Sequence, residues 1–137
     1  MRDLANHITL KRAISPAAAV ADNTPIVSQI VDLAGFDKAM FGILIGAVAD
    51  ADATFAVLVE HGDQANLSDA AAVPDSQLTG TEAAAGFKYD DGDKTRKIGY
   101  VGPKRYLRLT ITPSGNAGNA FVSAVAILSG ARYTLAS

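Results

Sequence analysis

The sequence predicts an all-β protein, a single-domain antiparallel β-sandwich or jelly-roll-like fold with long loops and short terminal arms. A length of 137 residues is enough for one domain with a core of its own. Twelve of the acidic residues are Asp and only two are Glu, and twelve Gly and five Pro accompany them. These residues favour turns over helix interiors. Short apolar or alternating segments recur between the turns, which is typical of a sandwich.

The first half of the chain predicts four strands. His7–Ile14 alternates between apolar and polar residues, and Ile26–Leu33 follows after a turn. Asp37–Ala47 is almost continuously apolar, so we expect a central strand that is buried on both faces. Thr54–His61 comes next, after a turn at Asp50–Asp52. Because this connection is short, the last two strands are expected to form an antiparallel hairpin.

Residues 63–94 carry weaker signals and predict surface loops. Ser68 or Asp69 is placed to cap one helical turn. Gln77–Thr81 predicts a short edge strand, and Gly86–Tyr89 predicts another short extended segment.

A strong β pattern returns in the last third of the chain. The three strands expected there are Thr95–Val101, Arg105–Thr112 and Ala120–Ser129. In the middle strand we expect a core face of Leu107, Leu109 and Ile111. Arg108 lies on the opposite face, which should point away from the core. In the last strand the most prominent candidates for the core are Phe121, Val125 and Ile127.

Nothing in the sequence divides the chain, so we expect one domain over residues 1–137. An N-terminal arm is expected at 1–6 and a C-terminal tail at 131–137. The longest apolar stretch, Ala39–Ala49, is too short to cross a bilayer, and no secretory signal is apparent. A net charge of −2 gives no general attraction to nucleic acid or to an anionic membrane.

The sequence shows no catalytic, cofactor or metal site, and we expect no enzyme. The absence of cysteine excludes disulfides, thiolate ligands and cysteine nucleophiles. Asp90–Asp93 lacks the acid spacing and final Glu of a calcium loop, and it predicts a tight turn. His7 and His61 are isolated, and His61 is expected at the rim of a strand. Neither a Gly-x-Ser-x-Gly motif nor a phosphate-binding glycine loop occurs.

A basic cluster is the strongest candidate for a binding surface. We expect it on one hairpin, and Arg and Tyr are favoured at protein interfaces. The candidate interface residues are Arg96, Lys97, Tyr100, Lys104, Arg105, Tyr106 and Arg108. Two other interpretations stay open, namely nucleic-acid binding, which the net charge disfavours, and a plain charged face of a sheet.

Five segments together resemble a family of small virion structural proteins from tailed bacteriophages. These segments are Ile30–Phe36, Asp52–Glu60, Leu67–Val73, Leu78–Glu82 and Arg96–Arg108. The resemblance implies a capsid decoration or cement protein, which binds the major capsid protein and stabilises the head shell. It further implies a homo-oligomer, such as a trimer, that is assembled in the host cytoplasm and lies on the capsid exterior.

Two alternative functions stay open. A neck or tail connector or terminator subunit would keep the chain in the virion. A carbohydrate- or receptor-binding β-sandwich would be a protein of a different class. Such modules typically present aromatic platforms, whereas this chain lacks Trp and contains only 7% aromatic residues.

Overall fold

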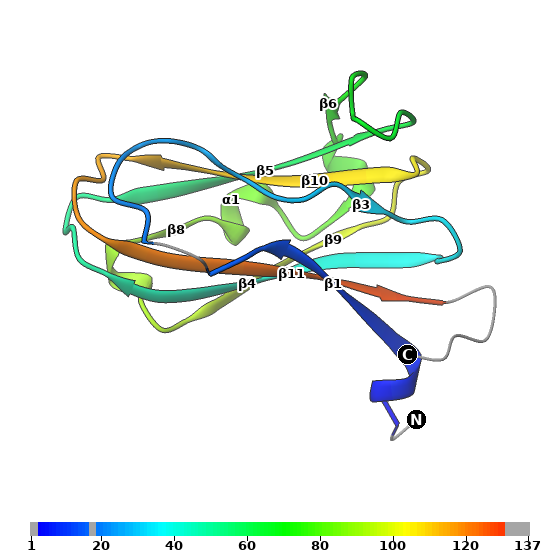
Figure 1. Ribbon diagram of the computed structural model, residues 1–137, viewed down its shortest axis with the longest axis horizontal. Helices are drawn as coiled ribbons and strands as arrows, with labels where there is room; N and C mark the ends of the chain where they lie inside the picture. Colours follow the sequence, from blue (N-terminus) through cyan, green and yellow to red (C-terminus); the bar gives the residue numbers. More distant parts are fainter. Residues whose placement is uncertain (1–2, 17–18, 131–137) are drawn as a thin grey trace.

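The computed structural model describes residues 3–16 and 19–130, and it consists of two antiparallel β-sheets packed face to face (Figure 1). The predicted all-β sandwich is therefore confirmed. Sheet A contains, in spatial order, β1 (Ile8–Ile14), β11 (Ala120–Ser129), β4 (Lys38–Val48), β9 (Thr95–Tyr100) and β7 (Leu78–Thr79). Sheet B contains β2 (Ile26–Val27), β3 (Val31–Asp32), β10 (Tyr106–Ser114), β5 (Thr54–Gly62), β6 (Ala71–Ala72) and β8 (Phe87–Lys88).

Sheet B is organised around its two long strands. β10 and β5 pair along their whole length, β2 and β3 pair with β10, and β6 and β8 pair with β5. The core lies between the two sheets and is built from alternate residues of the long strands, as the period of two in a strand requires. Its fully buried members include Phe41, Ile43, Ile98, Leu107, Leu109, Ile111 and Leu128.

The helical segments are short; the first precedes β1 and the others lie in connections between strands. They are η1 (Ala5–His7), η2 (Asp75–Gln77), α1 (Glu82–Ala85) and η3 (Tyr89–Asp91). Thr81 caps α1, because its hydroxyl oxygen accepts a hydrogen bond from the Ala84 N–H at 3.0 Å. No helix among the described residues has the length and apolar composition that a membrane span requires.

The helical turn expected at Ser68 or Asp69 does not form. The Asp69 carboxylate instead accepts hydrogen bonds from the N–H groups of Asp63 (2.8 Å) and Gln64 (3.2 Å), which closes the loop between β5 and β6. Of the expected terminal arms, residues 3–6 lead into η1 and β1, whereas the tail at 131–137 lies outside the described residues.

The two predicted hairpins, β4 with β5 and β9 with β10, are wrong, because the two strands of each pair lie in different sheets. β4 belongs to sheet A and β5 to sheet B, so the Asp50–Ala53 turn joins the two layers. β9 and β10 are divided between the sheets in the same way. A short connection between two apolar strands suits a crossover between packed sheets as well as a hairpin.

The central strand β4 is buried on one face only, which corrects the prediction of burial on both faces. It lies between β11 and β9, but Ile43 is 0% exposed and Leu44 is 54% exposed. No second layer covers the outside of sheet A within the described residues. The predicted core face of β11 is also wrong, because the even-numbered residues from Ala120 to Leu128 point inward and Phe121 points outward.

The expected strand Ile26–Leu33 is interrupted by Ser28, which is buried between β2 and β3. The Ser28 hydroxyl oxygen accepts a hydrogen bond from the Leu109 N–H at 2.9 Å. The Gln29 N–H donates to the carbonyl of Ala13 in β1 at 2.8 Å. The chain therefore leaves the ladder of sheet B for a short distance and contacts sheet A.

Candidate protein-interaction face

The predicted basic cluster is dispersed in the structure. Arg96 and Lys97 lie on β9 in sheet A, Arg108 lies on β10 in sheet B, and Lys104 and Arg105 lie in the connection. Four of the five cations form salt bridges: Arg96 to Asp91 (2.9 Å), Lys104 to Asp63 (2.7 Å), Arg105 to Asp32 (2.9 Å) and Arg108 to Glu60 (2.9 Å). The residues therefore do not form one basic surface, and most of their charge is neutralised within the chain.

The two tyrosines of the predicted interface are placed differently. Tyr106 is partly exposed, with its ring centroid 5.0 Å from the Arg105 guanidinium carbon. Tyr100 is only 4% exposed, and its hydroxyl oxygen lies 2.8 Å from Nδ1 of His61. Because its polar tip has partners inside the sandwich, Tyr100 belongs to the core and not to a surface. His61, expected at a rim, is buried as well.

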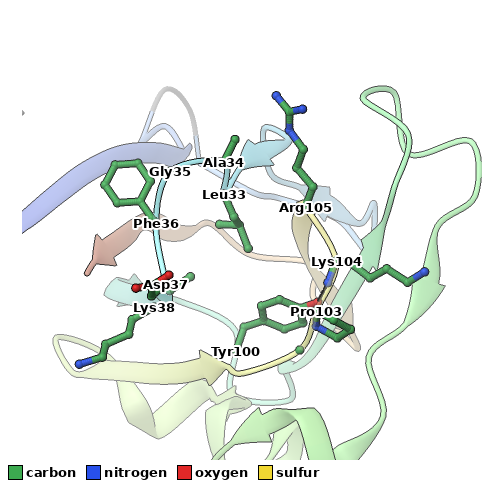
Figure 2. Close-up of a pocket in the computed structure, with 12 residues that line it drawn as sticks. Leu33, Ala34, Gly35, Phe36, Asp37, Lys38, Tyr100, Pro103, Lys104 and Arg105 are labelled. Atoms are coloured by element: carbon green, nitrogen blue, oxygen red, sulfur yellow. Dashed lines mark hydrogen bonds between the residues drawn. The ribbon is translucent and has the colours of Figure 1, made fainter. Parts of the chain in front are cut away.

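Arg105 stands at the rim of a cavity of about 380 Å³ at one end of the sandwich. It donates two hydrogen bonds to the Asp32 carboxylate, each of 2.9 Å, and this pairing lowers the pKa of Asp32 to about 2. In Figure 2, the ring of Tyr100 lies beside Pro103, while Arg105 and Lys38 point away from the cavity. The cavity therefore lacks a converging set of charged groups.

Exposed apolar side chains gather on a different surface, the outside of sheet A. Backbone pairing aligns its outward residues in rows across the strands. One row contains Leu10, Ile127, Met40, Gly99 and Thr79. The next row contains Arg12, Val125, Gly42 and Lys97. These residues, with Lys38, Leu44 and Phe121, are called the sheet A face below.

Three apolar residues of the sheet A face are at least half exposed. Leu10, Leu44 and Phe121 are 61%, 54% and 50% exposed, and they come from three neighbouring strands. Exposed apolar side chains on neighbouring strands of one face make that face a candidate interaction site.

Three cations of the sheet A face have no partner within the part of the chain that the structure describes. Six of the described Lys and Arg residues form salt bridges with carboxylates, and Lys11 donates to the Asp32 carbonyl. Arg12, Lys38 and Lys97 have neither a salt bridge nor a side-chain hydrogen bond within residues 3–16 and 19–130. All three are exposed, and no Asp or Glu occupies an outward position on the described strands of this face.

At one end, the sheet A face deepens into a groove of about 600 Å³. Leu4 and Val101 line it together with Met40 and Ile127, and Asp37 and Lys38 lie where β4 begins. The groove is mainly apolar, so it continues the character of the face and does not resemble a site for a small charged ligand.

The described residues offer little to a metal ion. No group of three or more His, Cys, Asp or Glu side chains able to hold a metal occurs among them. In the Asp90–Asp93 segment, the Asp91 carboxylate accepts a hydrogen bond from the Lys88 N–H at 3.0 Å and pairs with Arg96. This carboxylate is thus engaged in holding β8, η3 and β9 together.

Comparisons with known proteins extend the fold assignment. No family model matches the sequence, and no curated protein matches it. Among solved structures, the VP2 subviral particle of infectious bursal disease virus is similar over 93% of this chain and 33% of that chain, with a TM-score of 0.56 and 11% identity. At this identity the similarity shows the fold alone: the β-sandwich of this chain has the fold of part of a viral capsid protein.

Two further solved structures are similar at lower TM-scores. The SPBc2 prophage-derived protein YomS is similar over 88% of this chain and 91% of that chain, with a TM-score of 0.49 and 9% identity. The xylan-binding module CBM15 is similar over 96% of this chain and 95% of that chain, with a TM-score of 0.45 and 14% identity.

Among the three unpaired cations of the described residues, Lys97 is predicted as an interface residue from the sequence, whereas Arg12 and Lys38 are not. These two lie far from Lys97 in the sequence and join it only when β1, β11, β4 and β9 align. The alternation of residues in each strand could have placed them on this face. In β4, Lys38 lies on the same side of the strand as Met40, Gly42 and Leu44, and in β1, Arg12 lies on the same side as Leu10.

Proposed function

We propose that this chain is a virion structural protein of a tailed phage, and that it decorates the capsid by binding the assembled major capsid protein through the sheet A face. The observation that carries the proposal is that exposed apolar residues and three cations without a partner among the described residues lie together on this face. The resemblance of the sequence to phage virion proteins and the fold of a capsid-protein domain support it.

The charge of the face favours a partner that is not this chain. On a molecule with a net charge of −2, three unpaired cations on one apolar face complement a partner with an acidic rim around an apolar centre. Two copies placed face to face would bring Arg12, Lys38 and Lys97 against like charges, which disfavours self-association through this surface. If the protein forms the expected oligomer, sister copies should meet elsewhere.

Binding to tail-less capsid shells of the source phage tests the proposal. Co-sedimentation should show saturable binding of many copies per shell, because a decoration protein occupies repeated positions on the lattice. A neck or tail subunit would bind few copies or none, so the copy number separates the two virion roles. A chain that binds neither shells nor tails would contradict the virion assignment.

A substitution on the sheet A face provides the specific test. Leu44→Asp places a carboxylate in the apolar part of the face and should remove most of the binding to shells. Thr112→Asp is the matched control, because Thr112 is exposed on the outward side of β10 in sheet B. Both variants should keep the melting temperature of the parent protein. Equal binding by the two variants would exclude the sheet A face as the contact surface.

A further inference from the structure

The middle of the sheet A face contains a glycine, Gly42, that the chain's own fold does not require. Gly42 does not adopt the left-handed backbone conformation that favours glycine. A Cβ added to it would meet nothing closer than Val125 Cγ1 at 3.6 Å and Ile127 Cδ1 at 3.8 Å, which are ordinary van der Waals distances. Glycine weakens the interior of a strand, so its presence here needs another reason.

Two other glycines on the outside of sheet A are explained by internal packing. A Cβ on Gly46 would lie 3.0 Å from Phe121 Cβ and 3.3 Å from the Phe121 carbonyl oxygen. A Cβ on Gly99 would lie 2.9 Å from Thr79 Cβ. Neighbouring atoms already occupy the space at these two positions, whereas no atom of the described residues lies closer than 3.6 Å to a Cβ placed on Gly42.

The surroundings of Gly42 indicate what kind of partner would lie against it. Gly42 pairs with Lys97 on one side and Val125 on the other, and Arg12 follows Val125 in the same row. Along β4, the outward neighbours of Gly42 are Met40 and Leu44. Gly42 therefore lies between Lys97 and Val125 across the strands, with Arg12 beyond Val125, and between Met40 and Leu44 along its own strand.

We infer that Gly42 is the point where the partner's backbone approaches sheet A most closely. The occupant is an extended segment of the capsid protein, with a carboxylate side chain next to Lys97 and apolar side chains against Met40 and Leu44. Glycine in a strand commonly marks a place where another backbone comes close, and the unpaired cation beside it supplies the charge complement. This inference rests on the proposed function, since it names the contact through which the shell is bound.

Adding a side chain at Gly42 tests the inference with little risk to the fold. Gly42→Ala adds a single methyl group at ordinary van der Waals distances from Val125 and Ile127, and Gly42→Leu adds more bulk on the outer side of sheet A. Because the added Cβ displaces no described atom, Gly42→Ala should melt at or above the temperature of the parent, whereas Gly46→Ala should melt lower. The leucine side chain of Gly42→Leu extends from the outer side of sheet A, away from the core, so this variant should also stay folded. Affinity for capsid shells should fall only a few-fold for Gly42→Ala, and by at least about tenfold for Gly42→Leu. Thr112→Leu adds similar bulk to the outside of sheet B and should leave the affinity unchanged.

The charge of the occupant is tested at Lys97. Lys97→Glu should weaken binding to shells more than Lys97→Gln does, because reversal adds repulsion to the loss of attraction. Lys88→Glu is the matched control, since Lys88 is an exposed lysine in sheet B with a partner at 3.9 Å, Asp90. Duplex DNA serves as a second probe. Binding to DNA that falls steeply with salt, and that Lys97→Glu removes, would overturn the inference in favour of a nucleic-acid partner.

The outcomes separate this inference from the proposed function. If the parent protein binds shells and Gly42→Leu binds as well as Thr112→Leu, the partner does not approach Gly42, although the decoration role stands. If the parent protein does not bind shells, both the decoration role and this contact are wrong. A selective loss for Gly42→Leu and Lys97→Glu, with melting temperatures unchanged, is the expected result.

Discussion

The hydroxyl oxygen of Tyr100 lies 2.8 Å from Nδ1 of His61, although the two residues belong to different sheets. Their rings meet edge to face, with centroids 5.6 Å apart. Tyr100 Oη also accepts the N–H of Lys104 at 3.0 Å. With that bond accepted, the hydroxyl proton of Tyr100 is available to a neutral His61, which accepts it at Nδ1. The pair therefore ties β9, β5 and the connection to β10 together through buried polar groups.

This arrangement predicts a loss of stability in mild acid. Burial lowers the pKa of His61 below its usual 6.5, and the charge of Lys104 acts in the same direction, against Asp63 and Asp69. Below about pH 6.5 the unfolded chain therefore binds a proton that the folded protein still resists. The free energy of unfolding should be unaffected by this group above that pH and should fall as the pH drops below it. Urea denaturation at a series of pH values measures the change.

His61→Gln is the control for this pH dependence. Glutamine keeps a hydrogen-bond acceptor for Tyr100 but does not titrate. The free energy of unfolding of this variant should therefore no longer fall just below pH 6.5, in the range where histidine titrates and the carboxylates are still charged. If the free energy of unfolding changes with pH equally in the parent and the variant, His61 is not the source of the pH dependence.

The next prediction compares two neighbouring residues of β4. Ile43 is 0% exposed and Leu44 is 54% exposed, so their side chains lie on opposite faces of sheet A. Ile43→Asp buries an unpaired carboxylate and should cost several kcal/mol, on the order of the whole stability of a small domain. Leu44→Asp should leave the protein folded. Circular dichroism and thermal melting of the two variants check the difference, and similar melting temperatures would contradict the one-sided burial of β4.

The pattern of hydrophobic residues predicts where most strands lie, but it does not say which sheet each strand joins. Thr54–His61 and the alternation of Leu107, Leu109 and Ile111 appear as expected, because burial on one side imposes a period of two. The assignment of β4 and β5 to different sheets depends on contacts between distant segments. In particular, β4 pairs with β11 and β9, which come from the other half of the chain.

The same limit applies to the candidate site. Lys104, Arg105 and Arg108 pair with carboxylates from distant segments, namely Asp63, Asp32 and Glu60. Arg96 pairs with Asp91 in the turn that precedes its own strand. In β11, apolar residues occupy both parities, so the pattern alone could not show that Phe121 points outward. Which cations remain unpaired is a property of the folded chain, and this property separates Lys97 from its neighbours.

The Asp91 carboxylate predicts a stability effect that does not depend on calcium. It accepts the Lys88 N–H at 3.0 Å and contacts Arg96 at 2.9 Å and Lys94 at 3.4 Å. Asp91→Asn should therefore lower the melting temperature, because the amide lacks the charge that pairs with both cations. Asp93→Asn should have little effect, since asparagine tolerates the positive φ of 62° found there. Neither added calcium nor a chelator should change either melting curve, and a shift that calcium reverses would indicate a metal site.

The last prediction concerns Arg108 and Glu60, which face each other across β10 and β5. Their side chains are 24% and 20% exposed, and Arg108 Nη2 lies 2.9 Å from Glu60 Oε1. Arg108→Glu would set two carboxylates directly opposite each other in a partly buried site. We expect it to destabilise the fold by about 1–3 kcal/mol, because like charges directly opposite each other repel and the hydrogen bond between the two side chains is lost. Chemical denaturation of the variant against the parent measures the cost.

The charge-swapped double variant, Glu60→Arg with Arg108→Glu, separates an internal role of Arg108 from a role in an interface. The swap restores an attractive pair across the same two strands, so most of the lost stability should return. If the partner is bound through the sheet A face, the swapped protein should also occupy capsid shells as fully as the parent. If the swapped protein is stable but no longer binds shells, the partner must contact the charged side chain at position 108. The contact would then lie on the outside of sheet B, and the assignment of the sheet A face would be wrong.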